Sequence, residues 1–332
     1  VTLAKARDLA RAALRASTVG RDPGAEQQQA RVRTFGALTA LYLEQHAKRK
    51  KKSWRADARI IRQELVAWRD RPVAGLRRAD VRDRLESIVD RGAPVLANRV
   101  LALVRKILNF ALDREWIEAN VATKMARPTA EQSRSRVLTE DELRTVWAWL
   151  ERPAPEDADG THWTLAQAAL KVRLVTAQRG GEVINMRWED IDEGTAWWTI
   201  PAGHSKNKLA HRVPLTPMAL AIIRSLRGAD ATHVFAGIRG ARHRRGVLDG
   251  LPIADVRPHD FRRTAASLLA AGGIPRLTIS KVLNHVETGV TAIYDRHSYD
   301  AEKRVALEAW ARRLRAIVSE QSDGHVVAFV NA

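Results

Sequence analysis

Residues 257–299 read RPHDFRRTAASLLAAGGIPRLTISKVLNHVETGVTAIYDRHSY and hold an unusual gathering of chemically active side chains. His259 and Arg262 are three residues apart, so a helix that begins just before them carries both on one face of its first turn. His285 and Tyr294 follow, separated by a glycine. Two cations, a further donor and a phenol are the groups needed to attack a phosphodiester and to hold its charge.

Each of these residues also has an ordinary structural interpretation. A histidine and an arginine at a helix start often cap it or form ion pairs, and a histidine at a helix end often caps carbonyl groups. Tyrosines such as Tyr294 and Tyr299 are usually buried for packing. The rest of the chain has to decide between these interpretations.

The composition favours a basic globular protein with a polyanionic partner. The 332 residues are enough for two compact domains, and 45% of them are hydrophobic against 28% charged. The net charge of +18 favours nucleic acid, although a protein that is merely basic is the alternative. No apolar run approaches the length of a membrane helix, so no membrane partner is expected. Without cysteine there are no disulfides or thiolate metal sites, and a reducing cytoplasm is the natural compartment.

Residues 31–126 are expected to form a small helical domain with four helices. Thr34 is a suitable N-cap for the first of them, and Tyr42 lies on its apolar stripe. The basic run KRKKKSWR (48–55) falls between two helices, where phosphate contact competes with a solvated surface as its role. The residues predicted to contact DNA there are Lys50, Lys51, Lys52 and Arg55.

A polar, proline-containing composition marks residues 127–136 as a linker. Thr139 and Glu142 then form a capping box that opens a second domain over residues 137–319. This domain is expected to be mainly α-helical. Its helix 300–318 carries an apolar stripe that indicates an intramolecular packing face, made of Leu307, Trp310, Leu314 and Ile317.

The two ends of the chain are predicted to be separate segments. Residues 1–30 hold a helix over 3–16 and a polar linker, and the absence of an initial Met suggests a missing N-terminal piece. Residues 320–332 include the β-prone run HVVAFV, which is a candidate for packing on a neighbouring copy.

The second domain also contains a predicted β-hairpin. WWTIPAG (197–203) and HRVPLT (211–216) are short β-type runs, separated by SKNKLA, and predict a small antiparallel sheet in an α+β fold. Lys206 lies at the hairpin tip, where a lysine is mostly solvated but can also act as a general acid. Lys208 competes for the same role.

Two further basic segments flank this hairpin. TAQRGGEV (176–183) places Arg179 at a helix start with Glu182 one turn on, and the double glycine after the arginine lets another backbone approach closely. A surface ion pair is the ordinary interpretation. GIRGARHRRG (237–246) is a basic loop that either contacts phosphates, through Arg244 and Arg245, or is simply exposed.

The order of these motifs resembles the active-site series of the tyrosine recombinases, the phage integrase family. TAQRGGEVINMRW resembles the first arginine box, although Ala177 and Gln178 stand where the family commonly has glycine and a small residue. PHDFRRTAASLL resembles the His-x-x-Arg box, and VLNHVETGVTAIYDRH resembles the box of the second histidine and the nucleophile. The likeness covers residues 137–318. It extends more loosely to 34–125, which resembles the helical core-binding domain, and residues 1–20 resemble the end of an arm-type DNA-binding domain.

This resemblance implies a role for each catalytic residue. Arg179 and Arg262 would clamp the phosphate, Lys206 would be the general acid, and Tyr294 would be the nucleophile. His259 and His285 would occupy the histidine positions. The implied reaction cleaves and rejoins DNA through a 3′-phosphotyrosyl intermediate, without ATP, metal or other cofactor. Asp255 and Asp260 lie among arginines, so they are expected to form salt bridges and not a metal site.

The implied function is site-specific recombination that integrates or excises a mobile element. The expected partners are double-stranded DNA attachment sites, a homo-tetramer on synapsed DNA, and accessory DNA-bending or directionality factors. The expected location is the bacterial cytoplasm, on nucleoid DNA. Two alternatives remain open at this point: a type IB topoisomerase-like nicking and closing enzyme, and a DNA-binding protein without catalytic activity.

Overall fold

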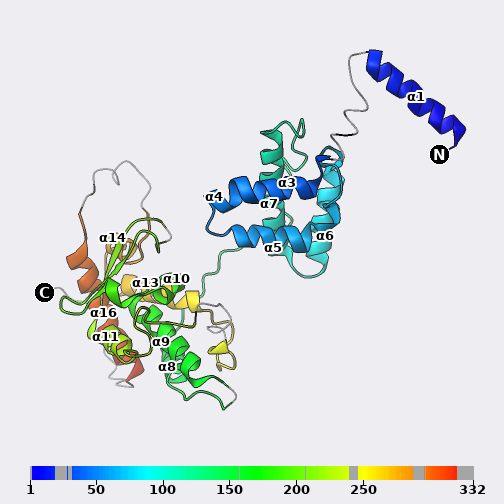
Figure 1. Cartoon of the computed structure of the whole chain (residues 1–332). Coiled ribbons are helices and arrows are strands. Elements are labelled where there is room, and N and C mark those ends of the chain that lie inside the picture. The colour runs from blue at the N-terminus through cyan, green and yellow to red at the C-terminus, as the bar shows by residue number, and fades with distance from the viewer. Residues whose placement is uncertain are drawn as a thin grey trace. The chain divides into compact units, whose positions relative to one another are not determined.

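A computed structural model describes residues 2–18, 28, 32–156, 158–205, 207–238, 246–286, 295 and 297–319. The chain divides into two compact units, Val1–Ser133 and Arg134–Ala332, and Figure 1 shows the elements of each. The division falls within residues 127–136, the predicted linker. The roles assigned to the two domains stay predictions.

The first unit is helical. Its α-helices are α1 (Leu3–Thr18), α3 (Phe35–Tyr42), α4 (Lys48–Lys50), α5 (Trp54–Glu64), α6 (Arg78–Asp90) and α7 (Pro94–Leu112). A π-helical turn covers Leu43–Ala47, and 3-10 turns cover Val66–Trp68 and Val73–Gly75. Thr34 caps α3 as predicted, because its hydroxyl accepts a hydrogen bond from the backbone N–H of Ala37 at 3.2 Å.

Tyr42 belongs to the core of this unit, as its place on the apolar stripe predicts. It is fully buried, and its ring meets Phe110 edge to face with the centroids 5.6 Å apart. Its hydroxyl donates a hydrogen bond to Asp57 Oδ2 at 2.9 Å, and Lys51 Nζ donates to both oxygens of that carboxylate at 2.7 and 2.6 Å. The buried carboxylate is therefore fully partnered, and the contacts join α3, α5 and the basic run.

The second unit combines helices with a small sheet, which confirms the predicted fold class. Its α-helices are α8 (Glu140–Trp149), α9 (Gly160–Thr176), α10 (Gly180–Ile184), α11 (Pro217–Arg224), α13 (Pro258–Ala271), α14 (Arg276–Val282) and α16 (Asp300–Val318). A 3-10 turn covers Trp188–Asp190. The antiparallel sheet has the order β1 (Ile191–Asp192), β2 (Trp197–Ile200) and β3 (His211–Pro214). β2 and β3 are the predicted hairpin, with Ile200 opposite His211, and β1 adds a third strand.

Helix α9 occupies the centre of the second unit, in contact with α10, α11, α13 and α16. Nearly every side chain in its second half is buried, as expected for a helix that is covered on all sides. Asp159 caps its start by accepting hydrogen bonds from the backbone N–H groups of Thr161 and His162 at 3.0 and 3.1 Å. Its end is marked by Ala177, which has a left-handed backbone with φ 55°.

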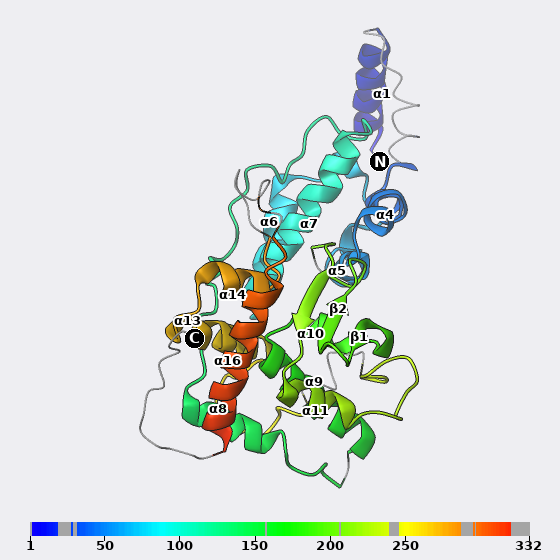
Figure 2. The ribbon, with the colours of Figure 1, turned by 90° about the vertical axis from the view of Figure 1, so that its left-hand side faces the viewer.

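Helix α16 packs inside the unit, as its apolar stripe predicts. Figure 2 shows it running alongside α13 and α14, and it also contacts α8 and β3. Trp310 is fully buried, and its indole N–H donates a hydrogen bond to the carbonyl of Leu174 in α9 at 2.8 Å. The stripe residues Leu307, Trp310, Leu314 and Ile317 are all buried.

The first residue of the second unit is tied to the start of α13. The guanidinium of Arg134 donates hydrogen bonds to Asp260 at 3.0 and 2.7 Å and to Asp255 at 2.5 Å. Asp260 is fully buried and also accepts hydrogen bonds from the backbone N–H of Arg257 at 2.9 Å and from Arg263 at 2.8 Å. The salt bridges expected for Asp255 and Asp260 are therefore confirmed.

Among the helices in the described ranges, none has the length and apolar character needed to cross a bilayer.

Replacing Trp310 with alanine should lower the free energy of unfolding of the second unit by about 3–5 kcal/mol, since it leaves a large cavity and an unpaired Leu174 carbonyl. Val305→Ala is the matched control in the same helix, because Val305 is 60% exposed and its loss should change stability by less than about 0.5 kcal/mol. Chemical denaturation followed by circular dichroism measures both. Equal effects of the two substitutions would contradict the assigned packing.

Candidate active site

The carbonyl end of α14 is the place where the predicted residues of the second unit converge. A helix leaves the carbonyl groups of its last turn without partners inside the helix. Three successive carbonyl groups at and just beyond the end of α14 instead accept hydrogen bonds from the side chains of other segments. The donors are Gln178 and His211 to Val282 O, Arg262 to Leu283 O, and Arg179 and Asn207 to Asn284 O.

Arg179 is held by its own helix as well as by α14. It is the N-cap of α10, and Glu182 accepts hydrogen bonds from its guanidinium at 3.0 Å and from its backbone N–H at 3.1 Å. Glu182 is only 3% exposed. The remaining terminal nitrogen donates to the carbonyl of Asn284 at 3.2 Å. These contacts fix both the position and the plane of the guanidinium.

The glycine after Arg179 makes room for a third arginine. A Cβ atom at Gly180 would lie 2.8 Å from the guanidinium carbon of Arg173, so a side chain there would require this guanidinium to move. Arg173 belongs to α9 and is 6% exposed. Gly180 thus permits the close approach that was predicted for the double glycine, whereas an added Cβ at Gly181 would meet no atom within 4 Å. The approaching group is a side chain and not a backbone.

Arg262 is the most deeply buried of the predicted catalytic residues that the structure describes. It is 4% exposed, and it donates hydrogen bonds to the carbonyl of Ala177 at 2.8 Å and to that of Leu283. Burial, and then the charge of Arg179, lower the pKa of its guanidinium to about 9. The group therefore keeps its positive charge at neutral pH.

His259 and His285 reach solvent next to these arginines. Partial burial lowers the pKa of His259, and the charges of Arg262, Arg263 and Arg173 lower it further. The pKa of His285 is lowered by partial burial and then by Arg262, Arg179 and His259. The lowered pKa favours the neutral form of both imidazoles, and a neutral imidazole can both accept and donate a proton.

The site carries an excess of positive charge. The positive charges of Arg173, Arg179 and Arg262 lie close enough to change the pKa of one another or of the same histidines. Glu182 is the buried carboxylate beside them. Cations gathered around one carboxylate in a partly desolvated place favour the binding of an anion. The arrangement can hold a phosphate and stabilise the charge that develops on it.

Several predicted residues lie outside the described ranges. Lys206, Tyr294, Arg244 and Arg245 are among them, as is the tail 320–332. Lys208 is described and is exposed, with a left-handed backbone of φ 60°.

The chain on either side of Lys206 and just after Tyr294 is anchored near α14. Ser205 and Asn207 flank Lys206 and form hydrogen bonds to Asn284. Asp295 accepts a hydrogen bond from Lys281 of α14 at 2.9 Å. Tyr299 precedes α16, and the ammonium group of Lys281 lies 4.6 Å from the centroid of its ring.

In the first unit, the basic run presents most of its cations to solvent. Lys50, Lys52 and Arg55 are exposed, and Arg55 lies over the ring of Trp54 at 4.7 Å. Lys51 differs from them because its ammonium group forms an ion pair with the buried carboxylate of Asp57. Lys50, Lys52 and Arg55 are therefore the predicted residues of this run that are exposed for contact with phosphate.

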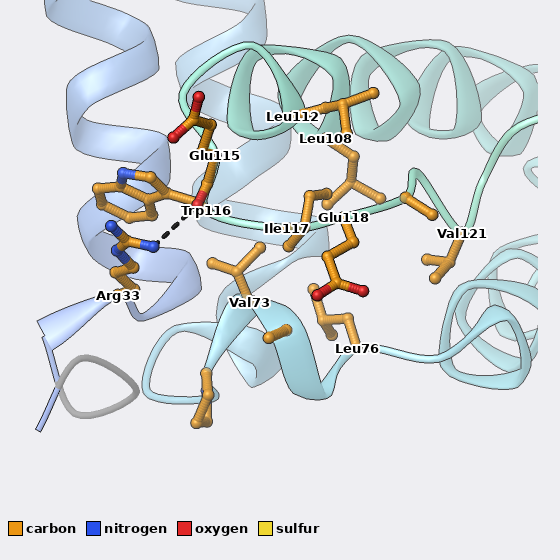
Figure 3. Close-up of a pocket in the computed structure, with 13 residues that line it drawn as sticks. Arg33, Val73, Leu76, Leu108, Leu112, Glu115, Trp116, Ile117, Glu118 and Val121 are labelled. Carbon is orange, nitrogen blue, oxygen red and sulfur yellow. Dashed lines mark hydrogen bonds between the residues drawn. The ribbon is translucent and has the colours of Figure 1, made fainter. Parts of the chain in front are cut away.

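The first unit also contains a cavity of about 840 Å³, shown in Figure 3, which the predicted residues do not line. Its wall is mostly apolar, with Glu115 and Glu118 at its edge. Arg33 lies 5.8 Å from the centroid of the Trp116 ring and donates a hydrogen bond to the carbonyl of Glu115 at 2.9 Å. The cavity has none of the chemistry of the α14 site.

Several polar residues at the carbonyl end of α14 were not predicted from the sequence. A weak signal existed for two of them: Arg173 interrupts the apolar run of α9, and His211 points inward on an otherwise apolar strand face. No local signal marks the others, because their partners are far away in the sequence. The missed residues are Arg173, Gln178, Asn207, His211 and Asn284.

Comparisons with known families match both units of the chain. The model of the phage integrase family matches residues 136–301, and that of the phage integrase central domain matches residues 35–128. The first match spans the boxes that contain Arg179, Arg262 and Tyr294.

Individual relatives and a solved structure are similar over most of the chain. The integrase of Enterobacteria phage P4 is 27% identical over 94% of this chain and 77% of its own length. Tyrosine recombinase XerC of Agrobacterium fabrum is 25% identical over 68% of this chain and 74% of its own length. The structure of a lambda integrase tetramer bound to a Holliday junction has a TM-score of 0.59 at 18% identity, and covers 76% of this chain and 78% of that one.

Acidification should destabilise the second unit through His211. Burial, and then the charge of Lys303, lower the pKa of this histidine to about 3, whereas an unfolded histidine takes up a proton near pH ~6.5. Between these values the unfolded chain binds more protons, so stability is complete above pH ~6.5 and falls as the pH drops through this window.

His211→Gln keeps an N–H donor for the Val282 carbonyl but removes the titrating group. We expect the melting temperature of this variant to fall less between pH ~7 and pH ~4 than that of the unchanged protein. Thermal unfolding at several pH values measures the difference. Parallel pH profiles would show that His211 is not the responsible group.

Proposed function

The chain belongs to the phage integrase family and is a tyrosine-type site-specific recombinase, and from this premise we propose that it cleaves and rejoins duplex DNA at the site around α14. The observation that carries this proposal is the convergence of Arg179 and Arg262 on successive carbonyl groups directly before His285. Two oriented guanidiniums can bind the non-bridging oxygens of one phosphate.

In the first step, the phenolic oxygen of Tyr294 attacks the scissile phosphorus. A bond forms between this oxygen and phosphorus, and the bond from phosphorus to the 5′-oxygen breaks. Tyrosine has an ordinary pKa near ~10, so its proton has to be accepted, and the neutral imidazoles of His259 and His285 are suited to this. Lys206 gives a proton to the departing 5′-oxygen. Arg179 and Arg262 stabilise the negative charge of the transition state.

In the second step, the 5′-hydroxyl of another strand attacks the 3′-phosphotyrosyl bond and releases Tyr294. The intermediate keeps the energy of the phosphodiester, so rejoining needs no ATP. The same arginines serve both steps, because the charge on phosphorus develops in the same place. Guanidiniums can supply this stabilisation without a metal ion.

What the relatives and the solved structures act on supports a proposal for the substrate and the assembly. A lambda integrase tetramer binds a Holliday junction, and the phage P4 relative is an integrase. We accordingly assign to this chain paired DNA attachment sites, a homo-tetramer on synapsed DNA, and the integration or excision of a mobile element. Accessory DNA-bending or directionality factors would act with it in the bacterial cytoplasm, on nucleoid DNA. The tail 320–332 is the candidate for packing on a neighbouring copy.

The first unit would act as the core-binding domain over residues 31–126. Exposed cations beside Trp54 suit a phosphate backbone, since charge and an aromatic face are presented together. Arg244 and Arg245 would add contacts from the second unit.

The nucleophile is tested on a nicked duplex that carries the attachment site and loses a short fragment on cleavage, which traps the covalent adduct. We expect an adduct with the unchanged protein and with Tyr299→Phe, and none with Tyr294→Phe, since only the phenol oxygen of Tyr294 is the nucleophile. Denaturing electrophoresis separates the adduct from free protein.

An adduct that persists in Tyr294→Phe would contradict the assignment. Relaxation of supercoiled plasmid at any sequence, without recombinant product, would instead favour a nicking and closing enzyme. Binding without any adduct in all three proteins would indicate a DNA-binding protein that lacks catalytic activity.

The DNA contacts of the first unit are tested by replacing neighbouring lysines one at a time. Lys50→Ala should weaken binding uniformly across sequences and reduce the slope of log affinity against log salt by about one. Lys51→Ala should instead destabilise the first unit, because it leaves the buried Asp57 with one partner fewer. Binding titrations at several salt concentrations and thermal unfolding distinguish the two. An unchanged salt slope in Lys50→Ala would exclude it from the interface.

A further inference from the structure

Three polar side chains link the β2–β3 turn to the end of α14. Asn207 donates a hydrogen bond from Nδ2 to Asn284 Oδ1 at 2.8 Å. Asn284 in turn donates from Nδ2 to Ser205 Oγ at 3.1 Å, and the hydroxyl of Ser205 donates to Asn207 Oδ1 at 2.5 Å. The three side chains form a closed ring of hydrogen bonds between segments that are 77 residues apart.

The ring of hydrogen bonds is largely shielded from solvent. Ser205 is only 1% exposed, and both asparagines are half-buried. Asn207 Oδ1 also accepts a hydrogen bond from the backbone N–H of Leu209 at 3.2 Å, so the ring fixes the backbone of the turn itself. Satisfied hydrogen bonds in a place of low dielectric are stronger than in water, and they hold one geometry.

The backbone of Asn284 ends α14 in a defined way. Its N–H donates to the carbonyl of Lys281 at 3.1 Å, and the N–H of His285 donates to the carbonyl of Ser280 at 3.0 Å. This pair of bonds is a Schellman motif, which needs a left-handed residue at the position of Asn284. Its φ is 48°, a conformation that glycine adopts freely and asparagine tolerates.

Asn284 therefore combines two roles. Its backbone aims one carbonyl group at Arg179 and places His285 directly after the turn. Its side chain holds Ser205 and Asn207, the two chain neighbours of Lys206. Glycine could fill the backbone role alone, so the amide side chain needs a further explanation.

We propose that Asn284 is a positioning residue. It ties the turn that contains Lys206 to the carbonyl end of α14, where Arg179 and Arg262 are held. Through this tie the chain neighbours of Lys206 and the two arginines are held at the same helix end. The inference rests on the proposed function, in which Lys206 protonates the departing 5′-oxygen. Misplacement of such a group by about 1 Å can slow a reaction by about a hundredfold.

Asn284→Gly removes the amide and keeps the left-handed turn, so it separates positioning from folding. The test compares two nicked duplexes, one with the ordinary 5′-bridging oxygen at the scissile phosphate and one with sulfur in its place. A thiolate leaves without protonation, because the pKa of a thiol is near ~8.5, far below that of an alcohol. The sulfur substrate therefore reports cleavage that does not depend on the acid.

In single-turnover cleavage, we expect Asn284→Gly to cut the oxygen substrate at least about tenfold more slowly and the sulfur substrate at the unchanged rate. Asn207→Ala should behave in the same way. Leu209→Ala is the matched control in the same turn, because its side chain is 57% exposed, and it should leave both rates unchanged.

Lys206→Ala distinguishes a failure of this inference from a failure of the proposed function. If the sulfur substrate does not rescue Lys206→Ala, the assignment of the acid is wrong. If it rescues Lys206→Ala, two results overturn the positioning role alone. One is equal slowing of both substrates in Asn284→Gly, and the other is an unchanged rate on oxygen.

Discussion

The need of a helix end for hydrogen-bond donors is the constraint on which the candidate active site depends. The carbonyl groups of Val282, Leu283 and Asn284 have no partners within α14, and burying them unpaired would be costly. In many proteins water or a following glycine turn satisfies such groups. Here the donors include Arg179 and Arg262, so the bonds that complete the fold are also the bonds that aim the guanidiniums. Local stability and preorganisation for catalysis are consequently properties of the same contacts.

The electrostatic state of the site follows from this packing. Arg173, Arg179 and Arg262 are brought together with Glu182 as their buried carboxylate. Burial first, and then repulsion from the neighbouring positive charges, lowers the pKa of Arg262 and of both histidines. A bound phosphate relieves that repulsion. The pentacovalent transition state carries more negative charge than the phosphodiester, so the same surplus favours the transition state over the bound substrate. Keeping the histidines neutral also leaves them able to accept a proton.

Local patterns in the sequence predicted the parts of the structure that depend on near neighbours. The cap at Thr34, the β2–β3 hairpin and the buried stripe around Trp310 all follow from short-range rules of capping and periodicity. The structure brings Arg179, His259, Arg262 and His285 together, but their roles stay proposals. The network around Asn284 could not be predicted, since Ser205 and Asn207 look like ordinary turn residues until the fold places them beside α14. Arg173 was missed for a related reason: only the fold shows that Gly180 leaves space for it.

The ion pair between Arg134 and Asp260 fastens the entry of the second unit to the start of α13. Asp260 closes the first turn of α13, the same turn that carries His259 and leads into Arg262. The chain that enters the second unit is therefore fastened to the base of the helix that carries both predicted residues. Breaking the ion pair between Arg134 and Asp260 would leave a buried carboxylate without its main partner, which is strongly unfavourable. The attachment thus makes the point where the chain enters the second unit and the start of α13 parts of one polar cluster.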